Sequence, residues 1–120
     1  MSDATPRYHL AVAGVVTVPT NPGATVTAVW TPQIACWLHL DLLAVHPPRL
    51  WEIVTLHVGW RAVDHLPVAR PPLGPFTARE YVAPGTPVTL TLRNRSRRRL
   101  CAKVVFGFEV RVLPAPIKQK

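Results

Sequence analysis

The sequence predicts an all-β fold, a single antiparallel β-sandwich of jelly-roll type with seven or eight strands. Fourteen prolines and six glycines are spread along the 120 residues, which favours short strands joined by stiff turns over long helices. Several segments alternate apolar and polar side chains with period two, as strands with one face on a core do. The turns between them are fairly regularly spaced, which is typical of sandwiches and jelly rolls. The length suits one domain with its own core.

The N-terminal segment predicts a loose arm followed by a strand. Residues 1–7 are polar and contain proline, so we place the folded domain at residues 8–113. The first strand is expected from Tyr8 to Val18, with large apolar side chains on one face and mainly small ones on the other: Tyr8, Leu10, Val12, Val16 and Val18 against His9, Ala11, Ala13, Val15 and Thr17. A face of small residues suits close packing or an interface. The run from Pro19 to Gly23 predicts the turn that ends this strand.

Two further strands are expected from Ala24 to Trp30 and from Ile34 to Ala44. The first alternates Thr25, Thr27 and Val29 with Val26, Ala28 and Trp30. The second has an apolar face and an amphipathic face: Ile34, Cys36, Leu38, Leu40, Leu42 and Ala44 against Trp37, His39, Asp41 and Leu43. A helix over residues 34–44 is also compatible with the pattern, but the flanking prolines and the length favour a strand.

The fourth long segment runs from Leu50 to Val63. Its two faces are expected to be Trp51, Ile53, Thr55 and His57 against Glu52, Val54, Leu56 and Val58. Gly59 interrupts the alternation and predicts a bulge or a change of direction. Four prolines between Asp64 and Pro75 predict an ordered loop long enough to suggest a function. A short strand is expected from Phe76 to Val82.

The stretch from Tyr81 to Leu113 predicts one long β-hairpin. After a turn at Pro84 to Pro87, apolar residues alternate with polar ones: Val88, Leu90 and Leu92 against Thr89, Thr91 and Arg93. Beyond the arginine-rich tip, a second apolar face consists of Leu100, Ala102, Val104, Phe106, Phe108, Val110 and Val112. Residues 114–120 form a basic C-terminal tail.

The formal net charge of +8 favours an anionic neighbour such as nucleic acid, an acidic protein or a membrane surface. The candidate contacts are the cations at and after the hairpin tip, namely Arg93, Arg95, Arg97, Arg98, Arg99 and Lys103. No aromatic residue is interleaved with them, so any binding to nucleic acid is expected to be non-specific. The alternative is a solvated tip that keeps the protein soluble.

The sequence does not indicate an enzyme, a metal site or a cofactor. It carries none of the common catalytic, phosphate-binding or dinucleotide-binding motifs. His39 and Asp41 lie two residues apart on one strand face and can touch, but with no nucleophile beside them a structural contact is favoured over a catalytic dyad. The histidines lack metal-ligand spacing, and Cys36 and Cys101 are expected to be free thiols. No secretory signal and no apolar run long enough for a membrane span is visible, so synthesis in the cytoplasm is expected.

Between Trp51 and Val110, about half of the chain, four successive stretches carry a resemblance: residues 53–59, the proline-rich link to Phe76, residues 82–96 and the strand at residues 104–110. Together they resemble small jelly-roll or β-sandwich proteins of bacteriophage and other viral particles. The resemblance implies a structural subunit of a virion, a capsid or decoration protein that forms a symmetric homo-oligomer and contacts other particle proteins. The candidate interface residues are Trp37, Trp51, Trp60 and Tyr81.

The alternative is a monomeric binding module for carbohydrate, peptide or nucleic acid. It would use exposed tryptophans and the loop from Asp64 to Pro75.

Overall fold

The computed structural model describes residues 7–63 and 79–112, which contain eight β-strands and no helix. The all-β expectation is therefore confirmed, and every strand pairing is antiparallel. The strands are β1 (Arg7–Val16), β2 (Thr25–Trp30), β3 (Cys36–His46), β4 (Trp51–Val58), β5 (Arg61–Ala62), β6 (Arg79–Val82), β7 (Val88–Asn94) and β8 (Lys103–Val112).

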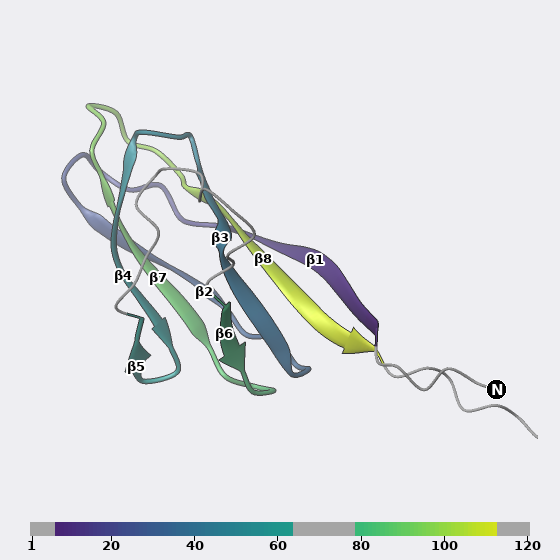
Figure 1. Ribbon diagram of the computed structural model, residues 1–120. Coiled ribbons are helices and arrows are strands. Elements are labelled where there is room, and N and C mark those ends of the chain that lie inside the picture. Colours follow the sequence, from purple (N-terminus) through teal and green to yellow (C-terminus); the bar gives the residue numbers. More distant parts are fainter. Residues whose placement is uncertain (1–6, 64–78, 113–120) are drawn as a thin grey trace, which may run out of the picture.

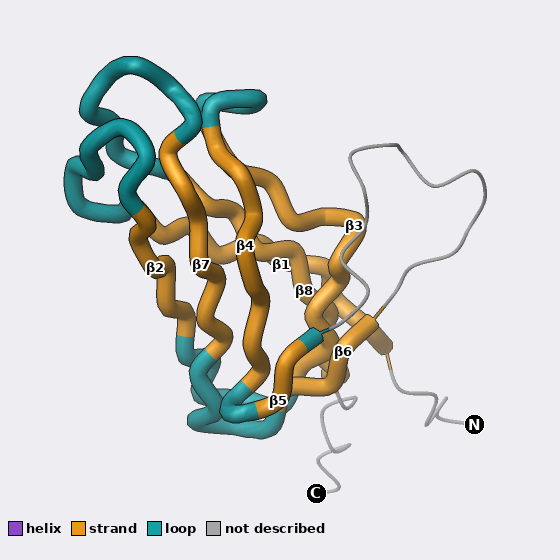
Figure 2. Tube along the Cα trace, turned by 90° about the vertical axis from the view of Figure 1, so that its left-hand side faces the viewer, coloured by secondary structure: helices purple, strands orange, loops and turns teal. Residues whose placement is uncertain are grey.

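The strands form two four-stranded sheets. The first sheet has the order β1-β8-β3-β6, and the second has the order β2-β7-β4-β5 (Figure 1). Viewed from the side, the second sheet lies in front of the first as a separate layer (Figure 2). The pairing is nested along the chain: β1 pairs with β8, β2 with β7, β3 with β6, and β4 with β5. Apart from β4 to β5, each connection between consecutive strands passes from one sheet to the other.

A single hydrophobic core draws on both sheets. The first sheet contributes Cys36, Leu38, Leu40, Val82, Val104 and Phe106, and the second contributes Ala28, Trp51, Leu56, Val58, Val88, Leu90 and Leu92. The alternation predicted for β2, for β7 and for the inward face of β8 is thus confirmed. Trp30 adds to this core by stacking on Phe106 with 5.4 Å between ring centroids.

The predicted hairpin from Tyr81 to Leu113 is wrong. Strand β7 belongs to the second sheet and β8 to the first, so residues 95–102 cross between layers instead of closing a tight turn. Thr20 pairs with Leu100 in an isolated bridge, and the Thr17 N–H donates to Ala102 O at 2.8 Å. The crossing segment therefore bonds to the chain between β1 and β2. Both strands have the alternation of half-buried strands, but that pattern does not say which strand pairs with which.

A large bulge in β3 reverses the faces predicted for its second half. His39 pairs with Gly107 and Ala44 with Val105, so four residues of β3 lie opposite one residue of β8. As a result Leu42 is exposed, whereas Leu43 packs against the core. A Cβ atom on Gly107 would lie 2.5 Å from Leu42 Cβ. The absence of a side chain at Gly107 is what lets Leu42 cross over β8.

A smaller bulge at Val54 breaks the alternation predicted for β4. The register shifts between Ile53 and Thr55, so Trp51 at the start of the strand and Leu56 after the bulge both point into the core. The two faces expected over the whole strand are therefore wrong. Gly59, with a φ of 62°, reverses the chain between β4 and β5, as its position in the sequence predicted.

Several predicted features lie outside the described residues. These are the arm at residues 1–6, the proline-rich loop at residues 64–75, the start of the strand expected at Phe76, and the basic tail at residues 114–120. Arg7, which we placed in the arm, is the first residue of β1 and pairs with Val112.

Candidate functional site

The solvent-facing side of the first sheet, here called the outer face, brings together side chains from four strands. Cross-strand pairing sets them in rows, because residues directly opposite one another project to the same side of a sheet. One row consists of Leu10, Glu109, Trp37 and Tyr81, and the next consists of Val12, Gly107, His39 and Arg79. Tyr8 and Val16 lie on the same side of β1, which is an edge strand.

The β1 part of the outer face is apolar and exposed. The relative exposure is 52% for Tyr8, 61% for Leu10, 70% for Val12 and 67% for Val16. Its small residues, including Ala11 and Ala13, face the other way and are partly buried. The strand therefore turns Ala11, Ala13 and Val15 toward the core and its larger apolar side chains, Tyr8 and Leu10, together with Val12 and Val16, toward solvent. Contiguous exposed apolar surface of this kind commonly marks an interaction site.

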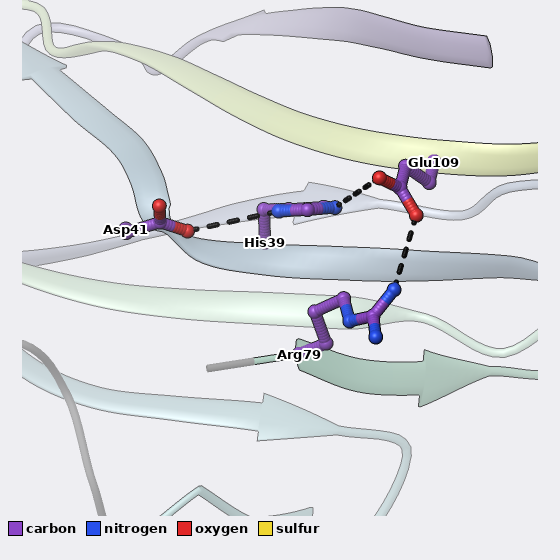
Figure 3. A network of polar contacts seen from close by, with 4 residues as sticks. All are labelled: His39, Asp41, Arg79 and Glu109. Carbon is purple, nitrogen blue, oxygen red and sulfur yellow. Dashed lines mark hydrogen bonds and ion pairs between the residues drawn. The ribbon is translucent and has the colours of Figure 1, made fainter. Parts of the chain in front are cut away.

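A polar network occupies the part of the outer face next to β6 (Figure 3). The His39 imidazole is 5% exposed and lies between two carboxylates, with Nε2 3.3 Å from Glu109 Oε1 and Nδ1 3.7 Å from Asp41 Oδ1. The Arg79 guanidinium donates a hydrogen bond from Nη1 to Glu109 Oε2 at 3.2 Å. Glu109 thus joins His39 to Arg79, and three strands are linked through one carboxylate.

The sequence pointed to His39 and Asp41 but missed the other half of this network. Glu109 and Arg79 reach His39 only because β8 and β6 flank β3 in the first sheet. The hairpin predicted from the sequence paired β8 with β7, so the sequence did not predict that β8 lies beside β3. Glu109 alternates with the apolar Phe108 and Val110 in the sequence, which assigns it to the other, mixed face of β8, and this was the available signal.

The network also holds the Arg79 guanidinium beside two aromatic side chains. The Arg79 guanidinium lies 5.9 Å from the centre of the Trp37 ring, and Trp37 meets Tyr81 edge to face at 5.2 Å. No hydrogen bond or ion pair joins the network to a hydroxyl or thiol within residues 7–63 and 79–112. The same ranges hold no group of three or more His, Cys, Asp or Glu side chains placed to bind a metal ion.

The four interface candidates separate into different environments. Trp37 and Tyr81 are 38% and 47% exposed on the outer face, and Trp60 is 93% exposed in the turn between β4 and β5. Trp51 is only 8% exposed and belongs to the core. Trp51 is therefore a packing residue, and its inclusion as an interface candidate is corrected.

The six candidate cations are divided between two strands and the connection between them. Arg93 lies in β7 and donates a hydrogen bond to Glu52 Oε2 at 3.1 Å. Lys103 is the first residue of β8. The other four, Arg95, Arg97, Arg98 and Arg99, lie in residues 95–102, here called the arginine loop, and all four are exposed.

The arginine loop is held in shape by Asn94, which is 1% exposed. Its Nδ2 donates to Thr20 O at 2.8 Å and to Arg98 O at 2.7 Å, while its Oδ1 accepts from the Ser96 N–H at 2.8 Å and from Ser96 Oγ at 2.7 Å. The Arg95 N–H donates to Leu50 O at 2.8 Å. An Asn followed two residues later by Ser is a local turn signal. The loop is thus an ordered structure at the end of β7 rather than a flexible tip.

Comparison of the chain with protein-family models, curated proteins and solved structures finds no match. In the two described ranges, no helix has the length and apolar character needed to cross a membrane. The functional argument therefore rests on the outer face and the arginine loop.

Proposed function

We propose that this chain is a non-enzymatic structural subunit that assembles as a symmetric homo-oligomer. The setting we infer is a viral or bacteriophage particle, with the subunit acting as a capsid or decoration protein. The observation that carries the proposal is the exposed apolar side of β1, because a monomer gains nothing from turning Leu10 and Val12 to solvent while its smaller residues face the core.

The strand order supports a jelly roll as the specific fold. In a jelly roll, eight antiparallel strands form two facing sheets through two Greek keys. The nested pairing of the first strand with the last, the second with the seventh, the third with the sixth and the fourth with the fifth has this character. Viral capsid domains use this architecture, as do lectins and cupins, so the fold alone does not identify the function.

The size of the apolar surface suits an interface with a second copy of the chain. Seven large side chains contribute to it: Tyr8, Leu10, Val12, Val16, Trp37, Leu42 and Tyr81. If each exposes on the order of 100 Å², the surface amounts to roughly 700 Å². Stable protein interfaces bury about 800 Å² on each partner, polar and apolar surface together, so these side chains and the charged residues of β8 on the same face, Lys103, Glu109 and Arg111, suit such an interface in extent.

The edge position of β1 adds a second reason to expect another copy there. The strand is ten residues long, contains no proline, and has one charged side chain, Arg7 at its first position; it pairs with β8 without a register shift. Soluble monomers usually protect such edges with charges, prolines or bulges, because an exposed edge pairs readily with another strand. Two copies meeting through β1 would form the self-complementary contact of a twofold dimer.

Size-exclusion chromatography with light scattering, at low and at high salt, tests this proposal. We expect a multimer that persists at high salt, since apolar contacts are not screened by ions. Val12→Lys should dissociate it without unfolding the chain, because Val12 is 70% exposed. Val29→Lys is the matched control, since Val29 is 49% exposed on the edge strand β2 of the other sheet. A wild-type monomer, or equal dissociation by both variants, would refute the proposal.

A monomeric binding module is the second candidate, and the aromatic cluster favours it. Trp37, Tyr81 and Arg79 form an ordered cluster, as sites that stack a sugar ring or a peptide side chain do. This candidate predicts a monomer whose binding to a glycan or peptide array is lost on Trp37→Ala. Array binding that survives Trp37→Ala would exclude this cluster as the binding site.

A further inference from the structure

A cavity of about 510 Å³ lies against the arginine loop. It is lined by Pro47, Leu50, Arg95, Ser96, Arg97, Arg98 and Leu100. The lining residues are three arginines and a serine of the loop together with three apolar residues from the β3–β4 connection and the end of the loop, and most of the lining surface is apolar. Its volume falls within the range of ordinary small-ligand sites, about 300–1,000 Å³.

The positive charge at this cavity is not neutralised by the rest of the described chain. The ion pairs in residues 7–63 and 79–112 engage Arg61, Arg79 and Arg93 but none of the loop arginines. Each described carboxylate already has a partner outside the loop: Asp41 and Glu109 contact His39, Glu52 contacts Arg93, and Glu80 contacts Arg61. The loop therefore presents concentrated cationic charge to solvent.

The loop backbone that carries these cations is also fixed in advance. Asn94 anchors Ser96 and Arg98, and the Arg98 N–H donates to Ser96 Oγ at 3.1 Å. A solvated run of charge needs no buried anchor of this kind. A prearranged loop lowers the entropy that a ligand loses on binding, so the arrangement is suited to recognition.

We propose that this cavity binds a nucleotide unit of a single-stranded nucleic acid. Guanidinium groups bind phosphate oxygens bidentately, and Arg95, Arg97 and Arg98 supply three of them. A base can lie against the apolar side chains of Leu50 and Leu100 and stack on a guanidinium plane. A polynucleotide alternates anions with flat, largely apolar rings, which matches the mixed lining. An acidic peptide supplies the anions without the rings.

This inference concerns a site separate from the proposed assembly surface and holds whether the chain is a monomer or a multimer. The lining contains no Asn, Gln or acidic side chain that would read base edges, and its arginines are assigned to phosphates, so binding should tolerate sequence. Its failure would leave the assembly proposal intact, because the oligomeric state is measured independently.

The experiment is fluorescence anisotropy with a labelled oligothymidylate of about ten nucleotides, within the usual site sizes for single strands. The three arginines should contact the phosphate of the bound nucleotide and those of its two neighbours. With about 0.7 contributed to the salt slope by each of these phosphates, the affinity should fall about 20-fold between about 50 mM and about 200 mM salt. An oligonucleotide of the same length and charge with abasic sites should bind about 5-fold more weakly or worse, because stacking of a base is lost.

The test variant is Arg95→Ser, Arg97→Ser and Arg98→Ser combined, and thermal unfolding checks that it is folded. It should bind at least about 10-fold more weakly at the lower salt and lose most of the salt dependence. The matched control is Arg7→Ser, Arg61→Ser and Arg111→Ser, which removes the same charge from exposed sites outside the cavity and should bind within about 3-fold of wild type.

Equal losses in the two triple variants would overturn the site, because net charge alone would then explain the binding. Equal affinity for the abasic and normal oligonucleotides would overturn the base contact. Competition by polyglutamate as effective as that by the oligonucleotide would overturn the assignment to nucleic acid in favour of an acidic protein partner.

Discussion

Replacing Asn94 with Ala tests whether one buried amide organises the arginine loop. The substitution removes four hydrogen bonds, two donated by Nδ2 and two accepted by Oδ1. Thr20 O keeps a bond from the Leu100 N–H. The single Ser96 hydroxyl hydrogen, which lies within reach of both Asn94 Oδ1 and Arg98 O, is then free to be donated to Arg98 O, so these two carbonyls are not left unpaired. The Ser96 N–H loses the acceptor that the structure provides.

The expected loss of folding free energy follows from the number of hydrogen bonds removed. At about 0.5–1.5 kcal/mol for each net hydrogen bond, and with two acceptors still partnered, Asn94→Ala should lower the free energy of unfolding by about 2–4 kcal/mol. Such a loss corresponds to a fall in Tm of roughly 10 °C for a domain of this size. Urea denaturation and thermal melting followed by circular dichroism measure both quantities.

Two companion variants sharpen the test. Asn94→Asp keeps the acceptor for Ser96 but sets a carboxylate against the carbonyl oxygens of Thr20 and Arg98, so it should destabilise at least as much as Asn94→Ala. Asn21→Ala changes an exposed asparagine and should shift stability by less than about 0.5 kcal/mol. If Asn94→Ala lay within that same margin of wild type, the loop would not depend on this residue and the reasoning would fail.

Three further predictions concern residues of the first sheet. Phe106→Asp should abolish folding, because Phe106 is 0% exposed and a buried unpaired charge is very costly; a folded variant by circular dichroism would contradict the observed register. Gly107→Ala should destabilise by about 1–3 kcal/mol through its clash with Leu42, and a urea midpoint equal to that of wild type would show that Leu42 moves aside freely. Burial raises the pKa of the Cys36 thiol, so at a given pH a smaller fraction of it is thiolate than of an ordinary cysteine. Iodoacetamide should therefore alkylate the exposed Cys101 before the buried Cys36. Preferential labelling of Cys36 in the folded protein would refute this.

The sequence was sufficient for the fold class because local patterns determine it. The alternation of Val88, Leu90 and Leu92, and the separate inward face containing Val104 and Phe106, both appear in the structure. The partner of each strand was not predictable in the same way. Period two gives the two faces of a strand and carries no information about its neighbour, so two strands close in sequence were assigned to one hairpin although they lie in different sheets.

The bulges were unpredictable for a related reason. In β3 the extra residues are the apolar Leu40, Leu42 and Leu43 together with Asp41, and an apolar run looks the same whether or not it changes face. Gly107 was the one local signal, but its meaning depends on Leu42 crossing above it, which is a contact between strands. The contact between His39 and Glu109 was unpredictable for the same reason, because these residues are 70 positions apart in the chain and meet only through the order of the strands in the sheet.

The outer face also indicates where a second copy should bind. Exposure is highest along the β1 edge, at 61% for Leu10 and 70% for Val12, and is lower across the sheet, at 38% for Trp37 and 47% for Tyr81. Toward β6 the surface carries the Arg79 and Glu109 ion pair, and covering it with apolar surface would cost desolvation energy. An interface centred on β1 has Leu10 and Val12 at its middle and leaves the Arg79 end of this pair, on the far edge strand β6, at its rim. The β1 edge is therefore the part of the sheet that a symmetric contact should use, and Val12→Lys should disrupt assembly more than Tyr81→Lys.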